Sequence, residues 1–245
     1  MTRLRALLLI TFAWATLAPL QAAFITIDNF SNPAAAQFVL IGPNPNPTTT
    51  SGSPTGLGST RTGTFSVVSP LPANPLDLTV QLGSGSYIHN SSNFAVTHGS
   101  LVYSAFTGGT GNFSASGIPL EFIVRFASVD PGFDLSTGLS ALNMPLDVVI
   151  ATSTGSLSGT FFVPSSPNIP IAYQIPFASL TAAGLVDLSQ VNTVTLNFNN
   201  GVNNRQAADF AVTGFDLVTT PVPPAVFIGL AAIPVLGLLR RFRKA

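Results

Sequence analysis

The stretch Leu120-Glu121-Phe122-Ile123-Val124-Arg125-Phe126 decides the fold class of this chain. Apolar residues at 120, 122, 124 and 126 alternate with Glu121, Ile123 and Arg125. This period of two places one face of a β-strand in a core and the other in solvent. Antiparallel sheets accommodate one wet face, whereas parallel sheets are apolar on both faces. The stretch therefore predicts an antiparallel β-protein.

The same alternation recurs outward from this stretch, at residues 76–82, 171–177 and 193–199. Turn signals separate these segments, and no long segment of helical period lies between them. We therefore expect residues 24–219 to form one all-β domain, an antiparallel β-sandwich. The turn signals lie at 83–85, 108–109, 130–132 and 199–201.

Three local features refine this expectation. The segment 209–218 changes phase at Gly214, which predicts a β-bulge there. Short helical turns are expected at 179–184 and 187–190. Residues 42–60 are rich in proline, glycine, serine and threonine, which predicts a low-complexity loop.

The N-terminal segment predicts export. Arg3 and Arg5 precede the apolar run 6–18, and small residues follow Pro19. This is the pattern of a secretory signal peptide over residues 1–23, cleaved after Ala22 or Ala23. An apolar run of 13 residues is too short to span a membrane, which takes about 20 residues.

The C-terminal segment, residues 220–245, predicts a membrane anchor. An apolar run of 18 residues, 222–239, contains the expected transmembrane helix 225–239. As a helix the run would reach about 27 Å, close to the ~30 Å of a hydrocarbon core. Basic residues mark the cytoplasmic side, which places the domain outside the cytoplasmic membrane. The basic cluster is Arg240, Arg241, Arg243 and Lys244.

Together, the two ends resemble the PEP-CTERM sorting-domain family. The tripartite order is a proline-rich motif (Pro221, Val222, Pro223 and Pro224), a short apolar helix and a terminal basic cluster. The motif has Val222 where the usual form has glutamate. The resemblance implies a bacterial protein exported to the cell envelope and processed by an exosortase-type enzyme. It also implies a final location at the cell surface or in the extracellular matrix.

The body, in turn, resembles galactose-binding-like jelly rolls. The segments that carry this likeness are 27–31, 175–180 with 187–189, and 209–217. The resemblance implies a jelly-roll-like sandwich and makes extracellular polysaccharide a conceivable partner.

The charge distribution excludes one class of partner. The nine acidic residues all lie in residues 24–220, with only Arg61, Arg125 and Arg205 as bases, which gives the body a formal charge of −6. Nucleic-acid binding requires a basic surface, so we expect none. The chain has no cysteine, which excludes thiol catalysis and thiolate metal sites.

Candidate ligand-contacting residues are few. Possible glycan contacts are Tyr87, Tyr103, Glu121 and Arg125, and further aromatic candidates are Phe94, Phe106 and Phe133. Asp130 and Asp134 flank a Pro-Gly-Phe turn and are candidate ligands of a structural calcium ion, which takes six to eight oxygens. His89 and His98 are read as structural residues.

No catalytic residues are predicted, and no other cofactor. Glu121 is the single glutamate, and neither a Gly-x-Ser-x-Gly elbow nor a phosphate-binding loop occurs. We therefore expect a non-enzymatic exported surface or matrix protein. The alternatives are a carbohydrate-binding module and, less favoured, a glycan-active hydrolase or lyase.

Overall fold

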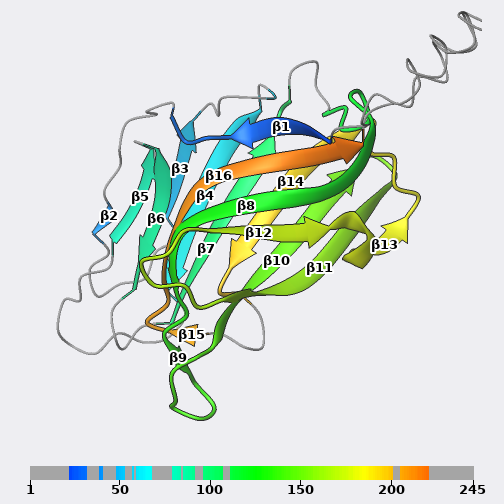
Figure 1. Cartoon of the computed structure of the whole chain (residues 1–245). Helices are drawn as coiled ribbons and strands as arrows, with labels where there is room; N and C mark the ends of the chain where they lie inside the picture. Colours follow the sequence, from blue (N-terminus) through cyan, green and yellow to red (C-terminus); the bar gives the residue numbers. More distant parts are fainter. Residues whose placement is uncertain are drawn as a thin grey trace, which may run out of the picture.

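The structure is a computed structural model. It describes residues 22–31, 39–40, 48–52, 57, 59–67, 79–83, 85–91, 96–106, 111–200 and 205–220. These residues form an antiparallel all-β protein, which confirms the expected class. Two seven-stranded sheets pack face to face (Figure 1).

The front sheet has the strand order β12-β8-β16-β6-β5-β2, and β1 also pairs with β16. Its longest strands are β8 and β16. The last strand of the domain, β16, lies in the middle of the sheet, because it pairs with β8, β6 and β1. The bounds are β1 Ala23–Asp28, β2 Val39–Leu40, β5 Thr79–Gly83, β6 Ser86–Asn90, β8 Ile118–Asp130, β12 Ile171–Pro176 and β16 Asp209–Thr220.

The back sheet has the order β13-β11-β10-β14-β7-β4-β3. A separate two-stranded sheet, β15 Arg205–Gln206 with β9 Phe133–Asp134, lies at one end of the sandwich. The bounds in the back sheet are β3 Thr48–Gly52, β4 Thr60–Val67, β7 Thr97–Ser104, β10 Asn143–Thr152, β11 Gly155–Pro164, β13 Thr181–Gly184 and β14 Val191–Phe198.

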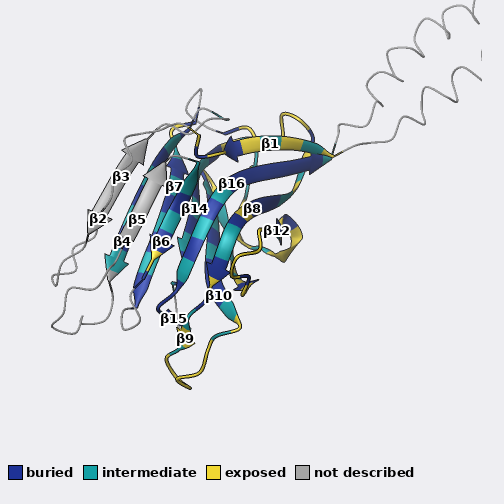
Figure 2. Cartoon of the chain, turned by 60° about the vertical axis from the view of Figure 1, so that its left-hand side comes forward, coloured by how far each residue is buried: buried dark blue, intermediate teal, exposed yellow. Residues whose placement is uncertain are grey.

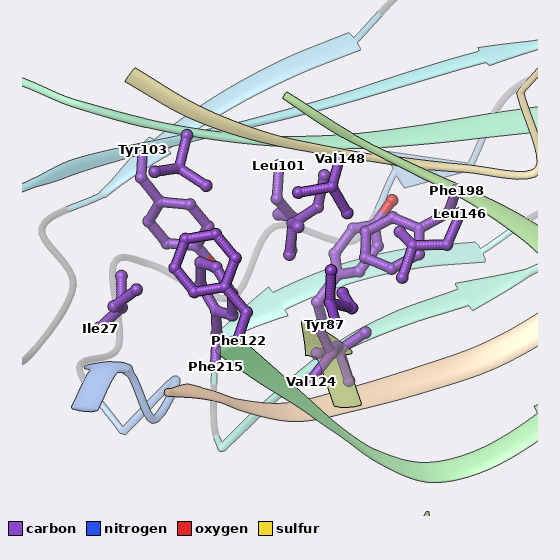
Figure 3. Packing of buried hydrophobic residues seen from close by; sticks show 14 of the residues in the cluster. Ile27, Tyr87, Leu101, Tyr103, Phe122, Val124, Leu146, Val148, Phe198 and Phe215 are labelled. Atoms are coloured by element: carbon purple, nitrogen blue, oxygen red, sulfur yellow. The ribbon is translucent and has the colours of Figure 1, made fainter. Parts of the chain in front are cut away.

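Aromatic side chains join the two sheets. Phe122 and Phe215 of the front sheet face Tyr103 of the back sheet, with the Phe215 ring 4.8 Å from Phe122 and 5.3 Å from Tyr103 (Figure 3). Further along, Phe198 of the back sheet packs 4.8 Å from Phe210 of the front sheet. Such pairs stabilise a core by about 0.5–1.5 kcal/mol each beyond the area that they bury.

Local predictions had mixed outcomes. The predicted bulge is confirmed, because the register between β16 and β8 shifts between Val212 and Gly214. The helical turn expected at 179–184 is wrong: a 3₁₀ turn covers Phe177–Ser179, and Thr181–Gly184 forms β13. Pairing with β11, which makes β13 the edge strand of the back sheet, overrides the helix preference of the two alanines. Residues 187–190 do form a turn, closed by the Gln190 N–H and the Asp187 carbonyl.

The expected low-complexity loop also contains a strand, since Thr48–Gly52 pairs with β4. The rest of 42–60, apart from Leu57 and Ser59–Thr60, lies outside the described residues. The apolar run 6–18 of the expected signal peptide, Phe94, and the whole of 221–245, with the expected motif, helix and basic cluster, also lie outside them. Within the described part of the chain, no helix is long and apolar enough to cross a membrane.

Candidate functional site

Both ends of the described domain meet at one corner. Strands β1 and β16 pair antiparallel, with Ala23 opposite Thr219 and Phe24 opposite Val218. Two views agree that the start of β1 and the end of β16 lie together (Figures 1 and 2). We call this end of the front sheet the exit corner, formed by Ala23–Phe24, Ile118–Leu120 and Thr219–Thr220.

Large apolar side chains are exposed at the exit corner. Phe24 is 61% exposed, Ile118 65% and Leu120 42%. The register between β8 and β16 shifts here, so that Glu121 pairs with Val218 and Pro119 with Thr219, which leaves Leu120 as the extra residue. A bulge of this kind redirects a side chain, and here it keeps an apolar residue on the surface.

Next to the exit corner, the outer face of the front sheet carries polar side chains. Arg125 donates from Nε to Asp216 Oδ2 at 2.8 Å, and Gln174 donates from Nε2 to Glu121 Oε1 at 3.4 Å. The Arg125 side chain lies over Gly214, since a Cβ atom there would meet Arg125 Cδ at 3.1 Å. The predicted residues Glu121 and Arg125 therefore do share one accessible face.

The two tyrosines predicted as glycan contacts are core residues instead. Tyr87 is 1% exposed and Tyr103 0%, and both rings pack between the sheets (Figure 3). Neither ring can stack on a sugar, and Phe106 is buried as well. Of the described aromatic candidates, Phe133 is exposed, but it lies in β9 at the far end of the sandwich.

A buried ion pair crosses the sandwich near the end of β1. Arg61 of β4 donates from Nη1 to Asp28 Oδ2 at 2.5 Å, and both side chains are fully buried. Asp28 also accepts hydrogen bonds from the Tyr103 hydroxyl at 3.1 Å and the Phe30 N–H at 2.8 Å. The guanidinium lies 4.8 Å from the centre of the Phe30 ring, and its Nε and Nη2 have no hydrogen-bond partner among the described residues. Burial, and next the Asp28 charge, raise the pKa of Tyr103.

Sequence reasoning missed this cluster. The available signal was parity, because Arg61 shares the inward side of its strand with Phe65. An arginine on an apolar face needs a buried acceptor, and Asp28 is 33 residues away in the chain. The ion pair connects the front sheet to the back sheet, which is a structural role.

His89 is also a structural residue. It is buried and stacked 4.6 Å from Phe210, and its Nε2 lies 2.7 Å from Thr97 Oγ1. Burial, with a smaller contribution from His98, lowers the pKa of His89 to about 3, so the ring is neutral at physiological pH. Burial also raises the pKa of Tyr87, whose hydroxyl lies 3.4 Å from His89 Nδ1.

The two aspartates predicted as calcium ligands act in separate turns. Asp130 accepts the Gly132 N–H at 3.0 Å, whereas Asp134 accepts Ser136 and pairs with Arg205. Hydrogen bonds from Ser136, and then Arg205, lower the pKa of Asp134 to about 2. Among the residues that the structure describes, no group of three or more histidines, aspartates or glutamates could hold a metal ion.

Asp209 is a carboxylate whose pKa is raised rather than lowered. It lies opposite Asp130 in the register of β16 and β8. Burial raises the pKa of Asp209 to about 6, and the Asp130 charge adds to the effect. The Ser91 N–H, 2.5 Å from Asp209 Oδ1, opposes it. This group therefore titrates near neutral pH.

Comparison with known proteins assigns no family. No protein-family model and no curated protein matches this chain. Among solved structures, the apo form of a cyclase from Fischerella sp. aligns over 82% of this chain and 98% of that chain, with 10% identity and a TM-score of 0.30. At that TM-score, the likeness transfers neither a fold nor an activity to this chain.

Proposed function

We propose that this chain is an exported, non-enzymatic, jelly-roll-like β-sandwich that a C-terminal sorting segment holds at the outer face of a membrane. An exosortase-type enzyme then acts at Pro221–Pro224 and passes the domain to the cell surface or extracellular matrix. One observation carries the proposal: Ala23 lies opposite Thr219. Removing a signal peptide at Ala22 or Ala23 and anchoring the chain beyond Thr220 would both take place at this corner, away from the core.

The position of β16 supports this role. The sorting segment continues directly from β16, which pairs with β8, β1 and β6 in the middle of the front sheet. A pull on the sorting segment would therefore be resisted by the pairing of β16 with three other strands. Such a domain can stay folded before and after the segment is cut.

Fractionation of the producing cells tests the proposal. The full chain should be found in the membrane fraction and be accessible to protease from outside. A chain that ends at Thr220 should be exported and released, because it lacks the apolar run 222–239. As the matched control, a chain with Arg240, Arg241, Arg243 and Lys244 changed to serine keeps the apolar run but loses its stop signal. Equal membrane retention of the full and the shortened chain would refute the proposal.

A second candidate function is neutral-glycan binding on the outer face of the front sheet. The observation that favours it is the accessible polar group of Glu121, Gln174 and Arg125, in which Gln174 donates to Glu121 and Arg125 donates to Asp216. The domain with Glu121→Ala and Arg125→Ala should then lose retention on polysaccharide that the unchanged domain binds. Equal retention of both proteins, or no retention of either, would exclude this face.

A further inference from the structure

We propose that the exit corner is a lipid-contacting surface, in which Phe24, Ile118 and Leu120 insert into the headgroup layer while the chain is anchored. The inference rests on the proposed function, because it requires the segment beyond Thr220 to enter a membrane. It adds an interaction surface and an orientation of the domain to that function.

The linker between the domain and the expected transmembrane helix is short. Four residues, 221–224, separate Thr220 from the expected transmembrane helix. Fully extended, they reach at most about 14 Å. One headgroup layer is about 5–8 Å thick, from the difference between the whole bilayer and its hydrocarbon core. Thr220 therefore lies within the headgroup layer or just above it.

The expected transmembrane helix is also short for a bilayer. A helix over 225–239 has 15 residues, which gives about 22 Å of length against a hydrocarbon core of ~30 Å. Such a mismatch is relieved by thinning the bilayer and by drawing flanking residues inward. Both responses bring Thr220 closer to the lipid.

Apolar side chains surround Thr220. Ile118 pairs directly with Thr220, and Phe24 lies on the other side of β16, opposite Val218. These positions on β1 and β8 flank β16, about two strand spacings or ~10 Å apart. The side chains exposed there are apolar, at 61% for Phe24, 65% for Ile118 and 42% for Leu120. Apolar side chains at the depth of the headgroups bury their surface at the boundary with the acyl chains.

Charge decides which kind of lipid contact this is. Among the described residues, the exit corner has no basic side chain, and Glu121 borders it. The α-amino group that cleavage would leave at Ala23 or Phe24 adds a single positive charge, so attraction to anionic headgroups is weak and the contact is mainly apolar. It should persist in neutral lipid and at high salt, where electrostatic binding is screened.

Site-directed fluorescence tests the inference, since the chain has no native cysteine. Single cysteines at Ile118 and Leu120 carry an environment-sensitive dye in the mature full chain, reconstituted in phosphatidylcholine vesicles with nitroxide-labelled lipid. Matched control labels lie at Leu139 and Leu142, which are 69% and 82% exposed. These controls follow the far end of β8, a strand of 13 residues and hence up to roughly 40 Å from the exit corner.

For the dyes at Ile118 and Leu120, we expect blue-shifted emission at low and high salt alike. The nitroxide-labelled lipid should quench more than half of their fluorescence. The labels at Leu139 and Leu142 should keep their emission in water. Co-flotation with the vesicles reports whether the chain is anchored. If the chain floats with the vesicles but all four labels show the emission of dye in water, the proposed lipid contact is wrong and the anchoring stands. A chain that does not float overturns the proposed function as well. A blue shift at Ile118 and Leu120 without vesicles, growing with protein concentration, would assign the corner to self-association and overturn the proposal.

Discussion

Removing Arg61 should destabilise the domain more than any single change at its surface. Arg61→Met keeps most of the side-chain volume but leaves the Asp28 carboxylate buried without its counter-charge, held by the Tyr103 hydroxyl and the Phe30 N–H. Breaking a fully buried ion pair from one side costs about 3–5 kcal/mol. For a domain of this size, that lowers Tm by roughly 10 °C.

The second partner turns this cost into a test of coupling. In the double variant Arg61→Met with Asp28→Asn, the amide Oδ1 can still accept from the Phe30 N–H, the amide Nδ2 replaces Oδ2 and can donate to the Tyr103 hydroxyl oxygen, and no charge is buried. We expect the double variant to recover at least about 2 kcal/mol relative to the sum of the two single changes. Asp28→Asn alone should also be costly, because it leaves the buried Arg61 guanidinium, whose Nε and Nη2 have no hydrogen-bond partner among the described residues, without its counter-charge.

The assay is urea unfolding of residues 23–220, followed by far-UV circular dichroism. The internal control is Arg125→Met, which breaks the Arg125–Asp216 pair on the outer face, where the Arg125 side chain is 48% exposed. That change should cost no more than about 1 kcal/mol. If Arg61→Met costs as little as Arg125→Met, the inference of a buried pair that connects the two sheets is refuted.

Three further predictions concern the pH dependence and the backbone of the domain. Because the pKa of Asp209 is raised to about 6, the folded state binds more protons than the unfolded state between about pH 4 and 6, so stability falls as pH rises through that window. Asp209→Asn should therefore stabilise the domain by about 1–2 kcal/mol at pH 8, a value reduced for partial exposure, and by nothing at pH 4, in unfolding curves at both values. The pKa of His89 is lowered to about 3, so between about pH 3 and 6.5 the unfolded state binds more protons than the folded state, and stability rises with pH in that window. In His89→Phe, the rise of Tm with pH over this window should be lost. Gly132→Ala should lower the free energy of unfolding by about 3 kcal/mol, because φ is +69° and the new Cβ would lie 2.0 Å from the Gln206 carbonyl oxygen. Gly138 has a similar φ of +68° but lies in open space, so Gly138→Ala should lower it by only about 1 kcal/mol. Equal costs would contradict the steric argument.

The alternation of side chains predicted the strands and one bulge because those features are local. Residues 120–126 fall in β8, and the phase change at Gly214 coincides with a register shift. These patterns depend only on the period of a pleated chain, which the sequence displays directly.

Which face of a strand is buried is not local, and here the sequence reading was wrong. In β6, Tyr87 and Ile88 are both apolar enough for a core, so the period alone cannot choose between them. Pairing with Ala211 and Val212 of β16 turns Tyr87 inward and leaves Ile88 partly exposed. The same applies to Tyr103 beside Val102 in β7.

The buried ion pair and the exit corner depend on contacts between distant parts of the chain. Asp28 and Arg61 come from different sheets and are 33 residues apart in the chain. Ala23 and Thr219 are paired in space although they lie at opposite ends of the domain sequence. No spacing rule in the sequence indicates either contact. The signal peptide and the anchor were predicted from the composition of the two ends, but the adjacency of the first and last strands of the domain required the register of β1 and β16.

The most direct test of the central claim is the intact mass of the protein isolated from the cells that produce it. The account predicts a chain that starts at Ala23 or Phe24 and ends between Thr220 and Pro224, so that both termini lie at the exit corner. A chain that retains residues 1–22, or one that ends at Ala245 at every stage, would contradict export followed by sorting at this corner.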